Sequence, residues 1–431
     1  MAETVDHARL LLLIHVDGVL NPLAIRLSGH VPSGFAAYHL AGPSATRRYP
    51  PGWDWRRIAG MDETQRREAF VRQLNEELGP SLALQFIALA DAVSNDRPID
   101  RASFRAAAFE YFDQHFAAET NPDTYFNWIG QLALPRPGTP LAHTGLWEWA
   151  MGIAHEWEDS RGEHQHKGSG YYFAGVRDVA VGDLDRGFLY MHQAAVEDTY
   201  PDRDRLPESP AGWFITLDAR RADQTYHDKV AEYESYLDGQ LAAYRAASRG
   251  TLTLDELRRR YKAHGSLTDA VTTLAHVISR LTRLQTTRGL KILDNRFAAL
   301  LLTQVALELC LTIEDVMQEK VGAGLTLGQL ASRYPAGHRI TLTKHEVTDL
   351  NRLAWSPAGF DSVVGDLLSG VSVLGFGRAL TDRETDLEIA VLVRNKSAHG
   401  LDRPAAAARL FDQITPRLFF VLFMAIETLY P

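Results

Sequence analysis

The sequence predicts a mainly α protein built from several helical domains, with a small mixed element of strand and turn at its N-terminus. The chain has 431 residues, enough for two or three ordinary domains, and 45% of them are hydrophobic, which excludes a largely disordered chain. From residue 61 onward, apolar residues recur mainly at helical spacing. Capping boxes and breakers of Gly and Pro divide these stretches into separate helices.

The first element, residues 1–60, is expected to contain a buried strand followed by a turn. Its apolar run, Leu10 to Ile14, leads into His15-Val16-Asp17-Gly18. These residues resemble the first motif of haloacid-dehalogenase-type phosphatases, a strand followed by Asp-x-Asp-Gly, whose first Asp is the nucleophile. His15 stands at that position, and an aspartyl-phosphate requires a carboxylate, so we interpret the match as a strand-turn remnant or a coincidence. A separate role for this element stays open.

Residues 61–280 are expected to form an acidic helical domain. Residues 281–431 carry 16 Lys and Arg against 16 Asp and Glu, so the net charge of −9 lies entirely in residues 1–280. Helices are expected over 61–78, 80–92, 102–118, 146–158, 222–247 and 268–287, and Thr253 to Glu256 forms a capping box that opens another. The apolar stretch from Trp213 to Leu217 predicts a short strand.

Within this domain, residues 171–201 are expected to form a hairpin of two helices joined at Gly182-Asp183. The segment resembles a single tetratricopeptide unit, because Gly175 and Gly182 lie seven residues apart and Ala194 matches the small residue of the second helix. Asp178 and Gly187 depart from that pattern, where an aromatic residue and an alanine are preferred. An ordinary helical hairpin is the alternative. Helical arrays of this kind bind peptides or protein partners, so a protein or nucleotide regulator is expected at this domain.

A stretch that runs from the end of the expected helix over 146–158 into the loop after it is rich in histidine and carboxylates, which are residue types that bind divalent metals. It contains neither a His-Glu-x-x-His motif nor a pair of cysteines, so we interpret it as a solvated loop and expect no metal site. Its candidate residues are His155, Glu156, Glu158, His164 and His166.

The C-terminal third, residues 290–431, is expected to form one helical domain. Its first helix, from Phe297 to Gln318, is apolar almost all round and therefore central, with Glu308 facing inward. A second helix follows over 381–394, with Leu387, Ala390, Val391 and Val393 facing inward, and a last apolar helix is expected over 405–430.

The strongest functional signal is Arg394-Asn395-Lys396-Ser397-Ala398-His399-Gly400, which lies between these two apolar helices. The segment resembles the signature of the HEPN family of small helical domains: Arg, a polar residue that is often Asn, three residues, then His. The resemblance covers about 290–431 and implies a homodimer through this domain, with a composite cleft that cleaves RNA without metal or cofactor. It also implies a setting in toxin–antitoxin systems or antiviral defence.

The residue chemistry fits this implication. RNA supplies its own nucleophile, the 2′-OH, so the protein needs only a group that transfers protons and a cation. We assign His399 as the acid–base group, Arg394 as the cation that neutralises the phosphorane, and Lys396 as a contact to the phosphate backbone. Asn395 fixes the His399 rotamer or binds the phosphate. Arg394 and His399 lie roughly 140° apart around a helix, which a two-fold dimer corrects by facing two motifs.

Two alternatives accompany this assignment. Arg394 and Lys396 are also compatible with solvated charges at an ordinary helix end, where cations suit the helix dipole. The second alternative is that the whole chain is a non-catalytic helical adaptor or dimerisation protein with an inactive HEPN-like domain. The zero net charge of residues 281–431 favours this second interpretation, because RNA cleavage profits from a basic groove.

Composition also indicates the compartment. Cys310 is the only cysteine and excludes an intrachain disulfide, which favours a reducing setting. No apolar run reaches the ~20 residues of a spanning helix, and the first ten residues have no basic region of the kind that begins a secretory signal. We therefore expect a cytoplasmic protein without a membrane partner.

Overall fold

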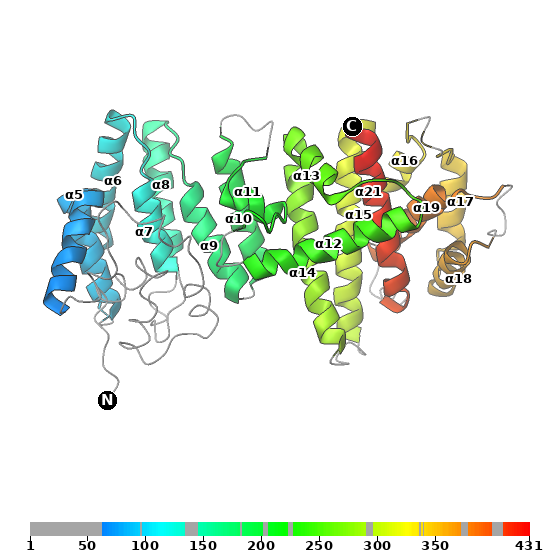
Figure 1. Ribbon diagram of the computed structural model, residues 1–431, viewed down its shortest axis with the longest axis horizontal. Helices are drawn as coiled ribbons and strands as arrows, with labels where there is room; N and C mark the ends of the chain where they lie inside the picture. The colour runs from blue at the N-terminus through cyan, green and yellow to red at the C-terminus, as the bar shows by residue number, and fades with distance from the viewer. Residues whose placement is uncertain are drawn as a thin grey trace. The chain divides into compact units, whose positions relative to one another are not determined.

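The structure is a computed structural model, and every regular element in its described residues is a helix, which confirms the predicted mainly α fold (Figure 1). The strand and turn expected in residues 1–60, including His15 and Asp17, lie outside the described residues. The structure describes residues 63–94, 97–133, 145–181, 183–200, 206–222, 227–289, 296–335, 338, 340–371, 378–398 and 408–431.

The chain divides into two compact units. The first comprises Met1–Tyr200 with Ala222–His227, and the second comprises Pro201–Arg221 with Asp228–Pro431. The main division therefore falls near residue 200, whereas the sequence placed its boundary at 280–290. The helices over 228–289, which the sequence assigned to the acidic domain, belong to the second unit with the C-terminal helices.

The first unit holds helices α5 to α10. Its first helix changes direction at Gly79, whose φ of 72° only glycine adopts without strain, directly before Pro80. Asp100 caps α6 and Asp183 caps α10 by accepting a hydrogen bond from the backbone three residues on. The bounds are α5 Glu63–Ser94, α6 Arg101–Ala117, α7 Asp123–Ala133, α8 Leu146–Arg161, α9 Gly168–Val181 and α10 Leu184–Asp198.

Aromatic side chains dominate the core between α5, α6, α7 and α8. Several of the large polar rings in this core donate a hydrogen bond, which offsets the cost of burying their polar atoms. Trp128 Nε1 donates to Glu77 at 2.8 Å, and Tyr125 donates to the carbonyl of Ala150 at 2.8 Å. The most deeply buried rings are Phe86, Phe104, Phe112, Tyr125, Phe126, Trp128 and Trp157.

Helices α9 and α10 form the predicted hairpin, and glycines set how closely they approach. A Cβ built on Gly187 would lie 2.6 Å from Val179 Cγ2, and one on Gly175 would lie 2.9 Å from Met191 Cγ. Neither position has room for a side chain, which explains why the sequence has Gly187 where a tetratricopeptide unit prefers alanine. Asp178, the other departure, is buried and bound by Arg177 through two hydrogen bonds.

The second unit holds the remaining helices. Among the described helices, capping boxes open four of this unit: those after Thr253, Thr343 and Thr381, each with a glutamate three residues later, and the one after Thr326, with Gln329. The bounds are α11 Pro210–Ile215, α12 His227–Ala246, α13 Leu254–Ala263, η3 Gly265–Leu267, α14 Thr268–Gly289, α15 Arg296–Val321, α16 Leu327–Ala331, α17 Lys344–Leu353, α18 Pro357–Leu368, α19 Asp382–Ser397 and α21 Phe411–Leu429.

Helix α19 lies at the centre of this unit, in contact with α15, α16, α17, α18 and α21 (Figure 1). The four residues predicted to face inward, Leu387, Ala390, Val391 and Val393, are all buried. Helix α15 confirms the predicted first helix of the C-terminal third. Its Glu308 is only partly inward, because Arg280 of α14 pairs with it at 2.5 Å near the surface.

The predicted strand from Trp213 to Leu217 is wrong, because these residues mostly belong to the short helix α11. Ser209 accepts a hydrogen bond from the Gly212 backbone, and Pro210 supplies the first helical position. A buried apolar run as short as this one is compatible with either a strand or a short helix.

Candidate functional site

The last turn of α19 carries three candidate site residues of the motif, Arg394, Asn395 and Lys396. Thr381 and Glu384 cap the start of this helix, and Arg394 and Lys396 lie in its last turn, where their charges complement the helix dipole. His399 lies outside the described residues, so its position relative to Arg394 and Asn395 stays a prediction. Arg394 points toward α15, whereas Asn395 and Lys396 both point toward α17.

Arg394 forms a bidentate ion pair with Glu314 of α15. Its Nε donates to Oε2 at 2.9 Å and its Nη2 donates to Oε1 at 3.1 Å. Glu314 also accepts from the Leu327 backbone at 2.8 Å, which fixes the carboxylate in turn. Within the described residues the hydrogen bonds of Arg394 use Nε and Nη2, which leaves the Nη1 edge of a side chain that is 21% exposed.

Asn395 and Lys396 point toward α17 instead. Asn395 Nδ2 donates to Asn351 Oδ1 at 2.8 Å, and Asn351 Nδ2 donates to its own helix at Val347. The Lys396 ammonium lies 4.4 Å from the centre of the Trp355 ring and donates to the Asn351 carbonyl at 3.4 Å. Lys396 is only 5% exposed, so its side chain is part of the packing between α17 and α19.

These residues line a pocket of about 430 Å³ between α17 and α19. Its walls are two amides, two cations and one aromatic ring, and the aromatic ring belongs to Trp355, which is 60% exposed. The sequence motif identified Asn395 and Lys396 but not the α17 side. That side lacks a motif signal, and only tertiary packing brings it to the last turn of α19. The lining residues are Asn351, Arg352, Trp355, Asn395 and Lys396.

Three buried acidic residues on α19 were not predicted, because acids between apolar residues of a helix read as its solvent-facing stripe. Glu384 is fully buried and accepts from Arg378 at 2.8 and 2.9 Å, and from the Thr341 backbone at 2.8 Å. Burial would raise its pKa, but these hydrogen bonds lower the pKa of Glu384 to about 2. Asp386 is held by Arg249 at 2.7 Å and by Arg417 at 3.1 Å.

Glu388 is different, because it is fully buried and neither of its carboxyl oxygens has a hydrogen-bond partner among the described residues. Burial is the main cause that raises the pKa of Glu388 to about 8, and the nearby charges of Glu346 and Glu384 add to it. The folded protein therefore holds this carboxyl in its neutral form at pH 7.

The expectation of a solvated loop holds only in part: residues 163–167 form a loop in which His164 is exposed, but Lys167 is buried in an ionic cluster. Lys167 is 1% exposed, and its ammonium pairs with Glu158 at 2.5 Å and with Glu197 at 3.5 Å. His164 bridges the same two carboxylates, with its Nδ1 and Nε2 each 3.2 Å from one of them. We call Glu158, His164, Lys167 and Glu197 the Lys167 cluster.

The position of the loop relative to the helices explains why Lys167 is buried. The loop ends at Gly168, where α9 begins, and α9 packs against α10, so Lys167 lies beside these helices and not in solvent. Burial would raise the pKa of Glu158, but bonds from His155 and Lys167 lower it to about 2. Each carboxylate of the cluster thus faces a cation or a histidine of the protein itself.

His166 lies beside this cluster between two further carboxylates. Its Nδ1 is 3.6 Å from Asp123 and its Nε2 is 3.0 Å from Asp198. These carboxylates raise the pKa of His166 to about 9. His155 bonds to Tyr171 at 2.7 Å, and Glu156 pairs with Arg105 at the surface. In the described residues no group of three or more His, Cys, Asp or Glu could hold a metal ion.

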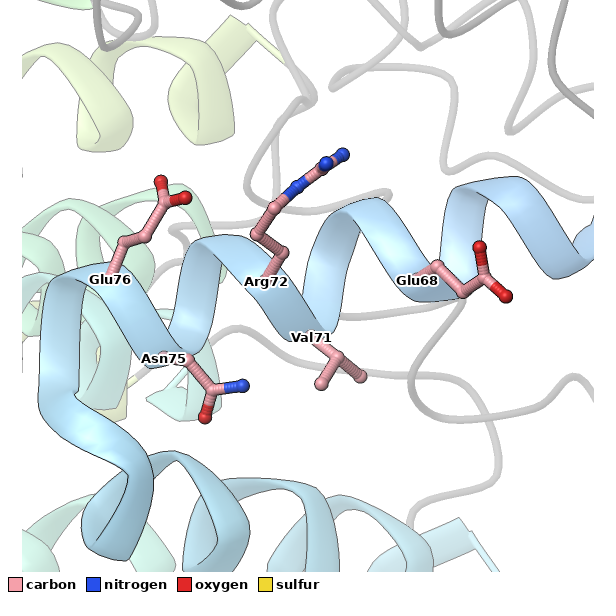
Figure 2. A pocket seen from close by; sticks show the side chains of 5 residues that line it. All are labelled: Glu68, Val71, Arg72, Asn75 and Glu76. Atoms are coloured by element: carbon pink, nitrogen blue, oxygen red, sulfur yellow. The ribbon is translucent and has the colours of Figure 1, made fainter.

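A second hollow runs along the first half of α5 (Figure 2). Arg72 and Glu76 point to one side of the helix, and Val71 and Asn75 point to the other. All five of its described lining residues, which also include Glu68, come from this one helix. They do not converge on a common point, so the hollow has no arrangement of groups that suggests chemistry.

None of the helices in the described ranges has the length and apolar character needed to cross a membrane. Comparison of the chain with models of protein families, with curated proteins and with solved structures found no match.

Proposed function

We propose that the protein is a metal-independent endoribonuclease of the HEPN type, with Arg394 and His399 at its centre. The observation that carries the proposal is the geometry of Arg394. Glu314 holds its guanidinium through Nε and Nη2, so the planar group is fixed in orientation while its Nη1 edge stays available for a phosphate oxygen. A cation that is already oriented stabilises a developing charge without reorganising during the reaction.

The proposed reaction uses the RNA's own 2′-OH. A neutral His399 accepts the 2′-OH proton while the 2′-oxygen bonds to phosphorus, and the bond from phosphorus to the 5′-oxygen breaks. A protonated His399 from a second copy gives its proton to that leaving oxygen. Arg394 neutralises the phosphorane between these steps. The products are a 2′,3′-cyclic phosphate and a 5′-hydroxyl, and the reaction requires a homodimer that faces two motifs across one cleft.

The test is cleavage of mixed single-stranded RNA and tRNA by the full-length protein in EDTA. Wild type should yield fragments with cyclic-phosphate ends, and His399→Ala should yield none. His345→Ala is the matched control, because this histidine is 85% exposed on α17 and outside the motif. Equal cleavage by wild type and His399→Ala would discard the assignment of His399.

A second candidate function is a non-catalytic adaptor or dimerisation protein. The contacts of the two cations favour it, because they also have a purely structural explanation. Glu314 compensates the charge of Arg394, and Lys396 is buried against Trp355. A folded, dimeric wild type that cleaves none of these RNAs would support the adaptor. The dimer itself is measured by sedimentation or light scattering in the same buffer.

The proposal also has a cellular setting. HEPN ribonucleases are associated with toxins and antiviral defence in the cytoplasm, and a free ribonuclease would endanger its host. We therefore propose that the first unit gates the cleft or senses a protein or nucleotide trigger. Removing residues 1–200 should raise the cleavage rate, and an unchanged or lower rate would refute the gate. A deletion of 1–280 is unsuitable, because it removes Arg249, which holds Asp386 in the core of the second unit.

A further inference from the structure

We infer that the pocket between α17 and α19 binds one unpaired nucleotide of single-stranded RNA, with the base stacked on Trp355. This inference rests on the proposed function, since it assigns an RNA subsite beside the motif of α19. The pocket volume of about 430 Å³ is within the range of ordinary small-molecule sites.

The first argument is the state of the Trp355 ring. One face of the indole is covered by the Lys396 ammonium at 4.4 Å, yet the residue is 60% exposed. A large part of this residue's surface is therefore accessible to a ligand. A base stacks on an aromatic face at a gain that does not depend on sequence, which is how single-stranded nucleic acids are held. The cation behind the ring fixes its orientation, so less freedom is lost on binding.

The second argument is the set of polar groups around the ring. Asn351 and Asn395 bond to each other through one N–H, and among the described residues the Asn395 carbonyl oxygen accepts no hydrogen bond. A side-chain amide presents a donor and an acceptor together, which matches the edge of a base. The pocket therefore combines a stacking face with a group that can read a base edge.

The third argument is charge. Arg352 lies at the rim with 79% of its side chain exposed, and its only charged partner in the described residues is Asp349, three residues earlier on the same helix. Such an exposed pair contributes little, so the guanidinium can exchange it for a phosphate at low cost. A single nucleotide on Trp355 would place its phosphate near this rim.

A protein partner is the competing occupant, because Leu353 is also exposed, at 46%, in the same part of α17. The lining argues against it. Apart from the ring, every residue that lines the pocket is an amide or a cation, whereas the buried core of a protein interface is mainly apolar. A neighbouring apolar residue without a polar role, Leu353, therefore makes a matched control for the ring.

The experiment measures binding separately from cleavage. A fluorescent single-stranded oligonucleotide of 2′-O-methyl RNA cannot be cleaved, and its anisotropy gives the Kd with the full-length protein. Trp355→Ala should raise the Kd about 5- to 150-fold, which corresponds to the loss of one base–aromatic stack. Trp355→Phe keeps a stacking face and should stay within about threefold of wild type, and Leu353→Ala should bind like wild type. Cross-linking of an RNA that contains 5-iodouridine should locate the adduct at Trp355.

Three results would overturn the subsite. In the first, the oligonucleotide does not bind wild type. In the second, Trp355→Ala binds the oligonucleotide as tightly as wild type does. In the third, Trp355→Ala and Leu353→Ala both convert a dimer into monomers without changing the Kd for RNA, which would make the patch a protein interface. RNA binding that depends on Trp355 without any cleavage would refute the ribonuclease proposal and support the subsite. Cleavage that depends on His399, with RNA binding that does not depend on Trp355, would support the ribonuclease proposal and refute the subsite.

Discussion

Replacing Glu388 with glutamine should stabilise the protein by an amount that grows with pH. Glutamine has nearly the same shape as the carboxyl it replaces, but it cannot ionise. In the unfolded chain Glu388 loses its proton near pH 4.5, whereas in the folded protein its pKa is raised to about 8. Between these values the folded state binds more protons than the unfolded state, so stability falls as pH rises through this window.

The size of the effect follows from the two pKa values. Each unit of difference is about 1.4 kcal/mol, so the penalty that Glu388 imposes on wild type approaches about 4 kcal/mol at pH 8 and vanishes below pH 4.5. The variant should therefore match wild type at pH 4.5 to within about 1 kcal/mol, because a protonated carboxyl and an amide are both uncharged. It should exceed wild type increasingly at pH 6 and pH 8.

The assay is denaturant unfolding of both proteins at these three pH values, followed by the exchange of α19 amide hydrogens as a local readout. All other titrating groups are shared, so they cancel in the difference between the two proteins. Glu76→Gln, the same substitution at an exposed position on α5, is the matched control. A gain at Glu388→Gln of the same size at every pH, or a loss at pH 8, would refute the reasoning.

Two further predictions concern the first unit and the helix interiors. Asp198→Asn should destabilise the protein by about 1–2 kcal/mol at pH 6 and by little at pH 10. The raised pKa of His166 stabilises the fold below pH 6.5, and that contribution is lost as the pH rises through about 9. Thermal unfolding at both pH values measures the loss of stability, and an equal loss at both would contradict the prediction. Gly187→Ala should cost about 1–3 kcal/mol, since its Cβ would lie 2.6 Å from Val179 Cγ2, whereas Gly239→Ala, whose Cβ would meet nothing within 4 Å, should gain about 0.5–1 kcal/mol. The same melting curves test this pair, and a loss at Gly239 equal to that at Gly187 would show that close approach is not the cause.

Local signals in the sequence predict most of the helices. The capping box at Thr253 and the four inward residues of α19 are confirmed, because both follow from spacing within one helix. The prediction of a strand at Trp213 is wrong because an apolar run of five residues is too short to distinguish a strand from a helix.

The surroundings of the motif could not be predicted, because they come from distant parts of the chain. The partner of Arg394 is Glu314, on another helix, and the partner of Lys396 is the ring of Trp355. No spacing rule connects such pairs. The burial of Lys167 was missed for a related reason, since its carboxylates, Glu158 and Glu197, come from α8 and α10.

The ionic contacts of α19 fix the rotation and the axial position of this helix at several levels. Near its start Glu384 is bound to Arg378, one half-turn later Asp386 is bound to Arg249, and in its last turn Arg394 is bound to Glu314. A shift of the helix by one residue would turn it by about 100° and move it by about 1.5 Å, which would separate every one of these charges from its partner. Arg378 bridges Glu346 of α17 and Glu384 near the start of α19, but at the pocket α17 is held to α19 by amide and ring contacts. Adaptation at the pocket must therefore come from the α17 side. Sequence change, ligand selectivity and motion at this pocket should accordingly concentrate in residues 351–355, while α19 stays constant.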